Sequence, residues 1–513
     1  MKAQDSRVSI YVLPITALFV LVFVTWSIIF PNVLDEVLTS IVNAISGNAP
    51  WFYLVATAIF VIFLCALALS RYGRVRLGKD HEEPEFSRTS WFAMLFAAGM
   101  GIGLVFFGVA EPVSHLNNPP YGRAEAGSAA AAELGMRYTF FHWGLHLWAA
   151  YAVVALCIAY FTFRLGRSGM LSSAFPGLMN KRSSAPIGDV INILGILSTM
   201  FGVAVSFGLG ALQINGGLNY LFGVPVSPIM QILIIVVITI VFTISAISGV
   251  ARGIRILSNI NIVLAIALML LILVIGATVF SSNIFFETLG GYIHNLLPMS
   301  LDQNAFDPGQ SKWAQDQTLF YFANAIAWSP FVGTFIARVS RGRTIREFVI
   351  VVLILPSLAC FAWFSIFGGT ALNIELGEGG GIISRAVEND VTTALFITLD
   401  QLPLSTITSL VAIVLVSVFF ITSADSGTFV LASMSTGGSQ NPKLFVKLIW
   451  AIAVSAVASV TLLSGGINAL QNLPIAIASP LTLIVLAMCF SLYRTMMREE
   501  PRVSTLNQSK VET

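Results

Sequence analysis

The feature that most constrains this chain is a succession of apolar segments, each long enough to cross a membrane. A helix needs about 20 apolar residues to span the hydrocarbon core of a bilayer. We count twelve such segments, at 12–30, 51–69, 91–107, 138–163, 190–222, 229–247, 262–280, 319–336, 348–372, 404–431, 448–463 and 473–492. The sequence therefore predicts an all-α integral membrane protein with twelve transmembrane helices.

Composition supports this reading over the alternatives. Hydrophobic residues make up 56% of the chain and charged residues only 10%, which is far from the balance of soluble domains. The apolar segments are continuous, whereas the strands of a membrane barrel alternate apolar and polar residues. We interpret the first segment as a retained span, because no small-residue cleavage signature follows it. The connections are short, so we expect one integral domain over 1–513.

Lys and Arg residues follow every even-numbered segment, which predicts that both chain termini lie in the cytoplasm. These residues are Arg71, Arg74, Arg76 and Lys79 after the second, Arg164, Arg167, Lys181 and Arg182 after the fourth, Arg252 and Arg255 after the sixth, Arg338, Arg341, Arg343 and Arg346 after the eighth, Lys443 and Lys447 after the tenth, and Arg494, Arg498 and Arg502 after the twelfth. Because this basic charge is spread over short loops and the net charge is +2, we expect no nucleic-acid partner.

The third segment contains "AGMGIGLVFFGVAEP", with Gly99, Gly101 and Gly103 at alternate positions. A dinucleotide-binding loop is excluded, since no parallel strand–helix unit surrounds these glycines. Close helix packing remains an alternative. We favour local unwinding, because three glycines weaken the helix and free carbonyl groups for a cation. Glu111, further along, has two open readings: a proton relay, or a cap for a helix break at Pro112.

The tenth segment contains "FFITSADSGTF", in which hydroxyl groups and Asp425 lie within an apolar run. Hydroxyls in membrane helices commonly bond back to their own helix. An acid at membrane depth generally faces a cavity, a partner or an ion. We therefore expect a second discontinuous helix here and a monovalent cation near Thr422 and Ser423. Broken helices in both halves are typical of carriers built from inverted repeats.

Aromatic residues form the third group. Trp148 and Tyr151 share a helix face in "FFHWGLHLWAAY", with Trp143 within reach, and Trp328 lies deep in the eighth segment. An interfacial aromatic belt is the simpler reading. The depth of Trp328 favours a cage for a quaternary ammonium group instead. His142 and His146 lack a third ligand, so hydrogen bonding between helices is expected there rather than a zinc site.

Several stretches together resemble the betaine/choline/carnitine transporter family. They are "AGMGIGLVFFGVAEP", "FHWGLHLWAAY", "GLGALQINGGL", "GIRILSNIN", "WSPFVGTFIARVSRGRTIREF" and "TSADSGTFVL", in family order across the third to tenth segments. The resemblance implies the leucine-transporter fold, with inverted five-helix repeats in spans 3–7 and 8–12 and two extra N-terminal spans. It also implies a homotrimer in the bacterial cytoplasmic membrane that works by alternating access.

On that resemblance the chain divides into N-terminal spans (1–90), repeat 1 (91–282), a periplasmic helix and loop (283–315), repeat 2 (316–493) and a short cytoplasmic tail (494–513). Residues 285–297 are expected to form the surface helix and 302–316 a polar loop.

The resemblance also implies ion sites. A sodium ion would be held by span 3 carbonyls and span 10 groups, which map to Ala97, Met100, Phe419, Thr422 and Ser423. A second sodium site would map to Thr199, Val203 and Phe331, but a valine methyl group cannot bind sodium. Ile262 stands where exchangers of the family carry a basic residue, so we predict cation-dependent transport without another cofactor; a proton remains an alternative coupling ion.

Substrate residues follow in the same way. The family's aromatic box maps to Trp143, Trp148, Tyr151 and Trp328, with Phe106 beside them, and two further tryptophans of its W-W-x-x-W pattern are Asn324 and Ala325 here. We therefore expect uptake of glycine betaine, choline or a similar osmolyte. The altered box leaves open an amino acid, taurine, ectoine or sulfonium compound. A channel or membrane enzyme is disfavoured, because no charge ring or catalytic set is visible.

Overall fold

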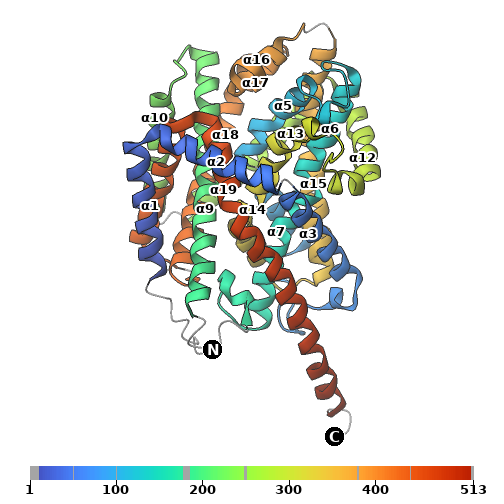
Figure 1. Ribbon diagram of the computed structural model, residues 1–513, viewed down its shortest axis with the longest axis vertical. Coiled ribbons are helices and arrows are strands. Elements are labelled where there is room, and N and C mark those ends of the chain that lie inside the picture. Colours follow the sequence, from blue (N-terminus) through green and yellow to red (C-terminus); the bar gives the residue numbers. More distant parts are fainter. Residues whose placement is uncertain are drawn as a thin grey trace.

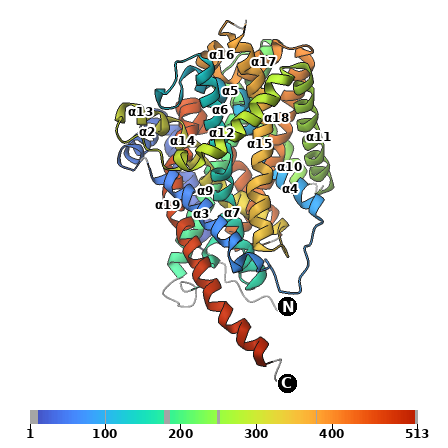
Figure 2. The same ribbon diagram turned by 90° about the vertical axis from the view of Figure 1, so that its right-hand side faces the viewer.

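The computed structural model describes residues 11–49, 51–99, 101–176, 185–247, 251–377, 380–439 and 441–509. Within these ranges helices account for nearly all regular structure, and an isolated antiparallel bridge joins Arg76 to Thr344. The long helices run mostly along the long axis of the molecule in two perpendicular views (Figure 1, Figure 2). The described part of the chain is therefore all-α, as the sequence predicts.

The long unbroken helices are α1 Val12–Ile29, α3 Phe52–Leu69, α9 Ala185–Phe222, α10 Pro228–Ile247, α11 Ala251–Ile275, α12 Thr278–Leu301, α14 Thr318–Val339, α15 Ile345–Leu376 and α18 Ser405–Ser435. The interrupted ones are α4 Arg88–Gly99 with α5 Ile102–Asn117, α6 Ala129–Trp143 with α7 Leu145–Ala159, and α19 Leu444–Ser509. The connecting helices are α2 Pro31–Asn48, α13 Pro308–Asp316, α16 Ile382–Asp390 and α17 Ala394–Asp400.

The described chain contains 8 helices that are long and apolar enough to cross a membrane, or 9 if α11 and α12, bent by 111°, form one span. Each of the twelve apolar segments overlaps one or two helices, but some share a helix and others are divided. The number twelve therefore stays a prediction, and so does the division into inverted repeats.

The third segment is interrupted where its glycines predict. The helix α4 ends at Gly99 and α5 begins at Ile102, with the backbone of Gly101 fully extended between them. Met100 lies outside the described residues. A second expected interruption is absent, because α5 continues through Pro112 to Asn117. Gly368 of α15 packs against the Pro112 ring and the Gly108 carbonyl, so a neighbouring helix supports α5 where proline removes a hydrogen bond.

The predicted break in the tenth segment is wrong. The helix α18 runs without interruption from Ser405 to Ser435. Its hydroxyl groups are satisfied within the helix, since Thr422 Oγ1 donates to the Val418 carbonyl at 2.9 Å and Thr428 Oγ1 to the Ala424 carbonyl at 2.8 Å. The polar residues of this stretch are thus accommodated by back-bonding to their own helix.

The fourth segment carries an interruption that the sequence reading missed. Helices α6 and α7 meet at Gly144, whose φ and ψ of −94° and −143° are not helical. A Cβ atom at Gly144 would lie 2.7 Å from the Tyr292 hydroxyl oxygen and 2.9 Å from the Phe361 ring, so only glycine fits there. The Leu145 N–H donates to the Tyr292 hydroxyl at 3.1 Å, which satisfies a donor at the new helix start.

Two predicted surface segments and the predicted seventh span have different bounds in the structure. The expected loop 302–316 contains α13, and the expected surface helix 285–297 is part of the longer α12. The predicted seventh span, 262–280, ends early because α11 stops at Ile275 and the chain bends before Thr278. Gly276 allows this bend: a Cβ atom there would lie 2.6 Å from the Ile272 carbonyl oxygen and 2.9 Å from the Thr370 hydroxyl.

The last two apolar segments share α19, which is kinked at Gly465 and Gly466. Gly466 has a φ of 58°, in the left-handed region that favours glycine. The helix rises on one side of the molecule, changes direction at the kink and descends on the other side (Figure 1). The core lies around α7, whose residues from His146 to Ala159 are all buried, as expected for a helix that is apolar on every face.

Several basic loops meet at one end of the molecule. The loop after α3 and the loop after α14 are joined by the Arg76–Thr344 bridge and by an N–H of Leu77 that donates to the Arg343 carbonyl at 2.8 Å. Arg164 donates to Asp80 at 2.8 Å. The exits of the second, fourth and eighth segments therefore share one end, as the charge pattern requires. Lys181 and Arg182 lie outside the described residues.

Candidate functional site

Trp143 lies at the end of α6, where the Gly144 break turns its half-buried side chain toward α5 and α14. Its indole N–H donates to Glu111 Oε2 at 2.7 Å. Its ring contacts Phe107, Tyr321 and Phe364, with centroid separations of 6.3, 5.9 and 5.2 Å. Phe106 is buried and lies 4.9 Å from Phe107, one ring further from Trp143. The sequence reading thus found Trp143 and missed its ring partners.

Trp148 and Tyr151 lie one turn apart on α7 and pack edge to face, with ring centroids 5.4 Å apart. Both are buried, and among the described residues Trp148 Nε1 has no hydrogen-bond partner. The neighbouring helix α14 approaches α7 closely, because a Cβ atom at Gly333 would lie 2.8 Å from a methyl of Val154. The predicted shared face of Trp148 and Tyr151 is therefore present in the structure.

Trp328 occupies the middle of α14 and is fixed against α9. Its indole N–H donates to the Gly202 carbonyl at 2.8 Å, and its ring lies 5.3 Å from Phe331. Among the described residues its ring makes no aromatic contact with α6 or α7. By these contacts the four predicted box residues form three groups in this structure, Trp143, Trp148 with Tyr151, and Trp328, rather than one closed cage.

Asn324 lies on α14 between Tyr321 and Trp328. It follows Tyr321, which contacts Trp143, by three residues and precedes Trp328 by four, so the three side chains share a helix face. Its Oδ1 atom is buried without a hydrogen-bond partner among the described residues, whereas Ala325 is fully buried. A buried acceptor without a donor is costly, so this face favours a ligand that brings an N–H or O–H group.

The predicted sodium residues come from two regions that the structure brings together. A Cβ atom at Gly210 of α9 would lie 2.9 Å from the Phe420 ring and 3.1 Å from Ile102 Cδ1, so the start of α5 and the middle of α18 meet there. Thr422 and Ser423 are half-buried and Phe419 is buried. Met100 and the side chain of Ala97 lie outside the described residues.

The residues of the second predicted sodium site lie on α9 and α14. Thr199 Oγ1 lies 3.9 Å from Met434 Sδ, and the Val203 methyls would lie 3.0 Å from a Cβ at Gly427, so both face α18. Phe331 instead packs on Trp328. Asp425, the acidic residue of α18, has Lys447 as its neighbouring charge, which accounts for a carboxylate at this depth.

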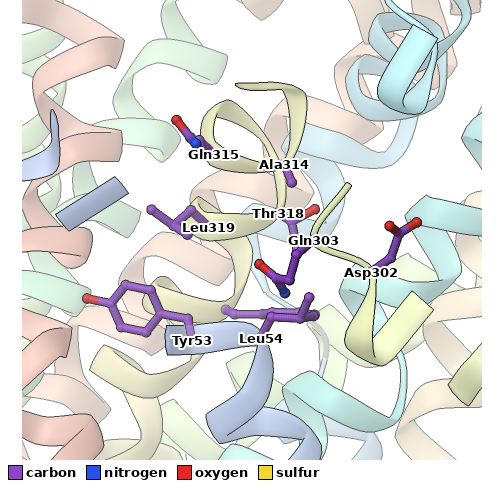
Figure 3. Close-up of a pocket in the computed structure, with 9 residues that line it drawn as sticks. Tyr53, Leu54, Asp302, Gln303, Ala314, Gln315, Thr318 and Leu319 are labelled. Atoms are coloured by element: carbon purple, nitrogen blue, oxygen red, sulfur yellow. The ribbon is translucent and has the colours of Figure 1, made fainter. Parts of the chain in front are cut away.

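The two histidines of the fourth segment make helix-to-helix hydrogen bonds, as expected. His142 Nδ1 lies 2.7 Å from Glu111 Oε1 and its Nε2 lies 3.0 Å from Thr318 Oγ1. His146 Nε2 lies 2.9 Å from Ser300 Oγ. A small cavity of about 20 Å³ borders this region, lined by α3, α13 and α14, and Asp302, Gln303 and Thr318 lie around it (Figure 3).

Comparison with known proteins assigns the chain to a family. The family described as "BCCT, betaine/carnitine/choline family transporter" matches residues 11–501. The chain belongs to this family. It is accordingly a multi-pass membrane transporter and not an enzyme, and the resemblance on the sequence motifs is confirmed.

Individual relatives of the transporter are similar over nearly their whole length. The chain is 48% identical to the glycine betaine transporter OpuD of Bacillus subtilis over 98% of this chain and 96% of the relative. It is 43% identical to a probable glycine betaine transporter of Desulfitobacterium hafniense, over 96% and 98% respectively. It is 42% identical to an ectoine/hydroxyectoine transporter of Virgibacillus pantothenticus, over 95% and 96%.

Proposed function

We propose that this transporter takes up a small zwitterionic osmolyte, with glycine betaine as the first candidate, by sodium-coupled secondary active transport. The observation that carries the proposal is the 48% identity to a glycine betaine transporter over 98% of the chain. Support comes from aromatic residues of the expected type on α6, α7 and α14, of which Trp143 contacts Tyr321 and Trp328 follows Asn324 by one helical turn. Aromatic rings attract a quaternary ammonium group through their electron-rich faces.

Each aromatic residue has a stated role in this proposal. Trp143 and Trp328, which are half-buried, provide the ring faces that contact the solute, while Trp148 and Tyr151 form the wall of the site on α7. Phe106 supports the Trp143 group through Phe107. Because Trp143 and Trp328 are in separate groups here, the proposal is that substrate binding brings these two side chains together around the solute. This closure is the local step of the alternating access that the family resemblance implies.

The sodium ion is proposed to lie between the α4–α5 break and α18, held by carbonyls of Ala97, Met100 and Phe419 and by the hydroxyls of Thr422 and Ser423. The contact of Ile102 and Phe420 at Gly210 supports this position. Thr422 donates its hydroxyl hydrogen to Val418, which leaves oxygen lone pairs for a cation. A second sodium ion at Thr199 and Phe331 is not part of the proposal, because Val203 stands at the remaining position of that site and a valine methyl group cannot bind sodium.

The larger architecture is proposed on the family resemblance. It comprises twelve spans with inverted repeats at spans 3–7 and 8–12, a homotrimer, and both termini in the cytoplasm of a bacterial cell. The meeting of the basic loops after α3, α7 and α14 at one end supports this orientation.

A second candidate solute is ectoine or a related compound with N–H donors. The observation that favours it is the buried, unpartnered Oδ1 of Asn324, which a trimethylammonium group cannot satisfy. The 42% identity to an ectoine/hydroxyectoine transporter supports the same choice.

Calorimetric titration of purified protein with glycine betaine and with ectoine, in sodium buffer, tests both candidates. The variant Asn324→Leu removes the acceptor and keeps the side-chain size. If ectoine is the solute, its affinity falls about fivefold while the affinity for betaine is unchanged or rises, since one lost hydrogen bond is worth about 1 kcal/mol. If neither compound binds to the wild type, the osmolyte proposal is wrong.

A further inference from the structure

Three titratable side chains outside the proposed solute contacts form a buried cluster. Glu111 and His115 lie one turn apart on α5, and His142 reaches them from α6. Their side chains are fully buried, and one ligand atom from each lies within 4.8 Å of the others. The sequence alone showed no third metal ligand beside His142 and His146. In the fold, Glu111 and His115 of α5 lie beside His142.

Glu111 carries the negative charge of this cluster. Its carboxylate accepts from the Trp143 indole at 2.7 Å, contacts the Tyr321 hydroxyl and lies 2.7 Å from His142 Nδ1. Within the described residues no Lys or Arg pairs with it, and its titratable neighbour at hydrogen-bond distance is His142. An ionised carboxylate at this depth needs a compensating positive charge.

His115 presents an open lone pair. Its Nδ1 lies 3.2 Å from the Gly135 carbonyl, which can only accept, so the ring proton is on Nδ1. The other nitrogen of the neutral ring, Nε2, is then an acceptor. It is buried, and it has no hydrogen-bond partner among the described residues. This nitrogen is therefore available to a cation.

The remaining atoms of the cluster are held by outer partners in the manner of metal ligands. His115 donates to a backbone carbonyl, His142 Nε2 contacts Thr318 Oγ1, and Glu111 Oε2 accepts from Trp143. Such partners orient ligands in metal sites. They leave His115 Nε2, His142 Nδ1 and Glu111 Oε1 as the three inner atoms.

We propose that Glu111, His115 and His142 bind a divalent transition-metal ion of the Zn²⁺ class. Two imidazole nitrogens and one carboxylate oxygen are a ligand set that Zn²⁺ accepts with a fourth position open. Binding displaces the proton between Glu111 and His142 and draws His115 closer to both. The cavity lined by Thr318 and Gln303 (Figure 3) adjoins the cluster, because Thr318 also contacts His142.

A consequence for transport rests on the proposed function. Glu111 accepts the indole N–H of Trp143, a proposed solute contact, so a metal ion on Glu111 restrains the side chain that must move when the site closes. Micromolar Zn²⁺ is therefore expected to inhibit osmolyte uptake.

The binding test uses the full-length protein, purified through a histidine-free tag, with Zn²⁺ followed by calorimetry and Co²⁺ by visible absorption. We expect one site per chain that weakens as the pH falls, because the ligands must be deprotonated. His115→Gln should weaken binding at least tenfold and Thr318→Val about tenfold, since loss of an outer partner costs roughly 10- to 100-fold. His146→Gln is the matched control: it removes a buried histidine of the same segment that lies outside the cluster.

Wild-type protein without a saturable site, or affinity that is unchanged in folded His115→Gln protein, would overturn the proposal. Loss of binding in His146→Gln with retention in His115→Gln would also contradict it. The binding measurements need no osmolyte, so their outcome does not depend on the proposed substrate. If the protein binds Zn²⁺ but Zn²⁺ does not inhibit uptake, only the proposed link to transport is contradicted.

Discussion

Gly202→Ala is the substitution that tests the placement of Trp328 most sharply. The methyl group would lie 2.7 Å from Trp328 Cδ1 and 3.0 Å from its Nε1, which is closer than side chains pack, so the indole must move. The move also breaks the 2.8 Å hydrogen bond from the indole N–H to the Gly202 carbonyl. The variant leaves every proposed solute contact chemically intact and displaces one of them.

The size of the effect follows from these contacts. A cation–π contact in a desolvated site is worth about 1 to 2 kcal/mol, so displacing the ring should weaken solute binding about five- to thirtyfold. The free energy of unfolding should fall by about 0–2 kcal/mol, because the overpacking cost of about 1–3 kcal/mol is partly offset by the better helix propensity of alanine, about 1 kcal/mol.

Solute affinity is measured by calorimetric titration in saturating sodium, with folding checked by thermal unfolding. Gly290→Ala on α12 is the control, since a Cβ atom there meets nothing within 4 Å, and its affinity should stay within about twofold of the wild type. Unchanged affinity in folded Gly202→Ala protein would refute the placement of Trp328 in the solute site.

Two further predictions concern the proposed sodium site and Glu82 in the loop after α3. Thr422→Ala should raise the sodium concentration for half-maximal transport about tenfold, whereas Thr428→Ala, which removes an equivalent back-bonded hydroxyl, should not; equal effects would contradict the sodium site. The Lys79 backbone N–H and the Arg341 guanidinium hold the pKa of Glu82 below its ordinary value, so this carboxylate stabilises the fold at neutral pH and loses that effect as the pH falls below about 4.3. In the Glu82→Gln variant the unfolding temperature should fall less on acidification than in the wild type or in Glu83→Gln. The same fall in all three proteins would contradict this role of Glu82.

The sequence predicted those features of the fold that depend on local composition. Apolar length located the helices, and three glycines in five residues located the interruption at Gly101. The interruption at Gly144 was missed because a single glycine among aromatic residues gives no local signal; the contacts with Tyr292 and Phe361 that require it come from other helices. The expected break in α18 is absent because its hydroxyls are satisfied within the helix, and the break at Pro112, one of two readings of Glu111, is absent where Gly368 packs against α5.

The contacts between the candidate site residues could be predicted only in part from the sequence. Sequence spacing correctly placed Trp148 and Tyr151 on one face. It could not reveal that Trp143 shares contacts with Phe107 and Tyr321 while Trp328 packs on α9, because these partners are far apart in the chain. The meeting of Glu111 and His115 with His142 is likewise a consequence of helix packing.

Uptake of labelled glycine betaine and ectoine into proteoliposomes tests the central claim most directly. The account predicts saturable uptake of at least one of them that is accelerated by an inward sodium gradient and persists when a protonophore dissipates the proton gradient. Uptake that ignores sodium and collapses with the protonophore, or no uptake of either compound by correctly folded protein, would contradict it.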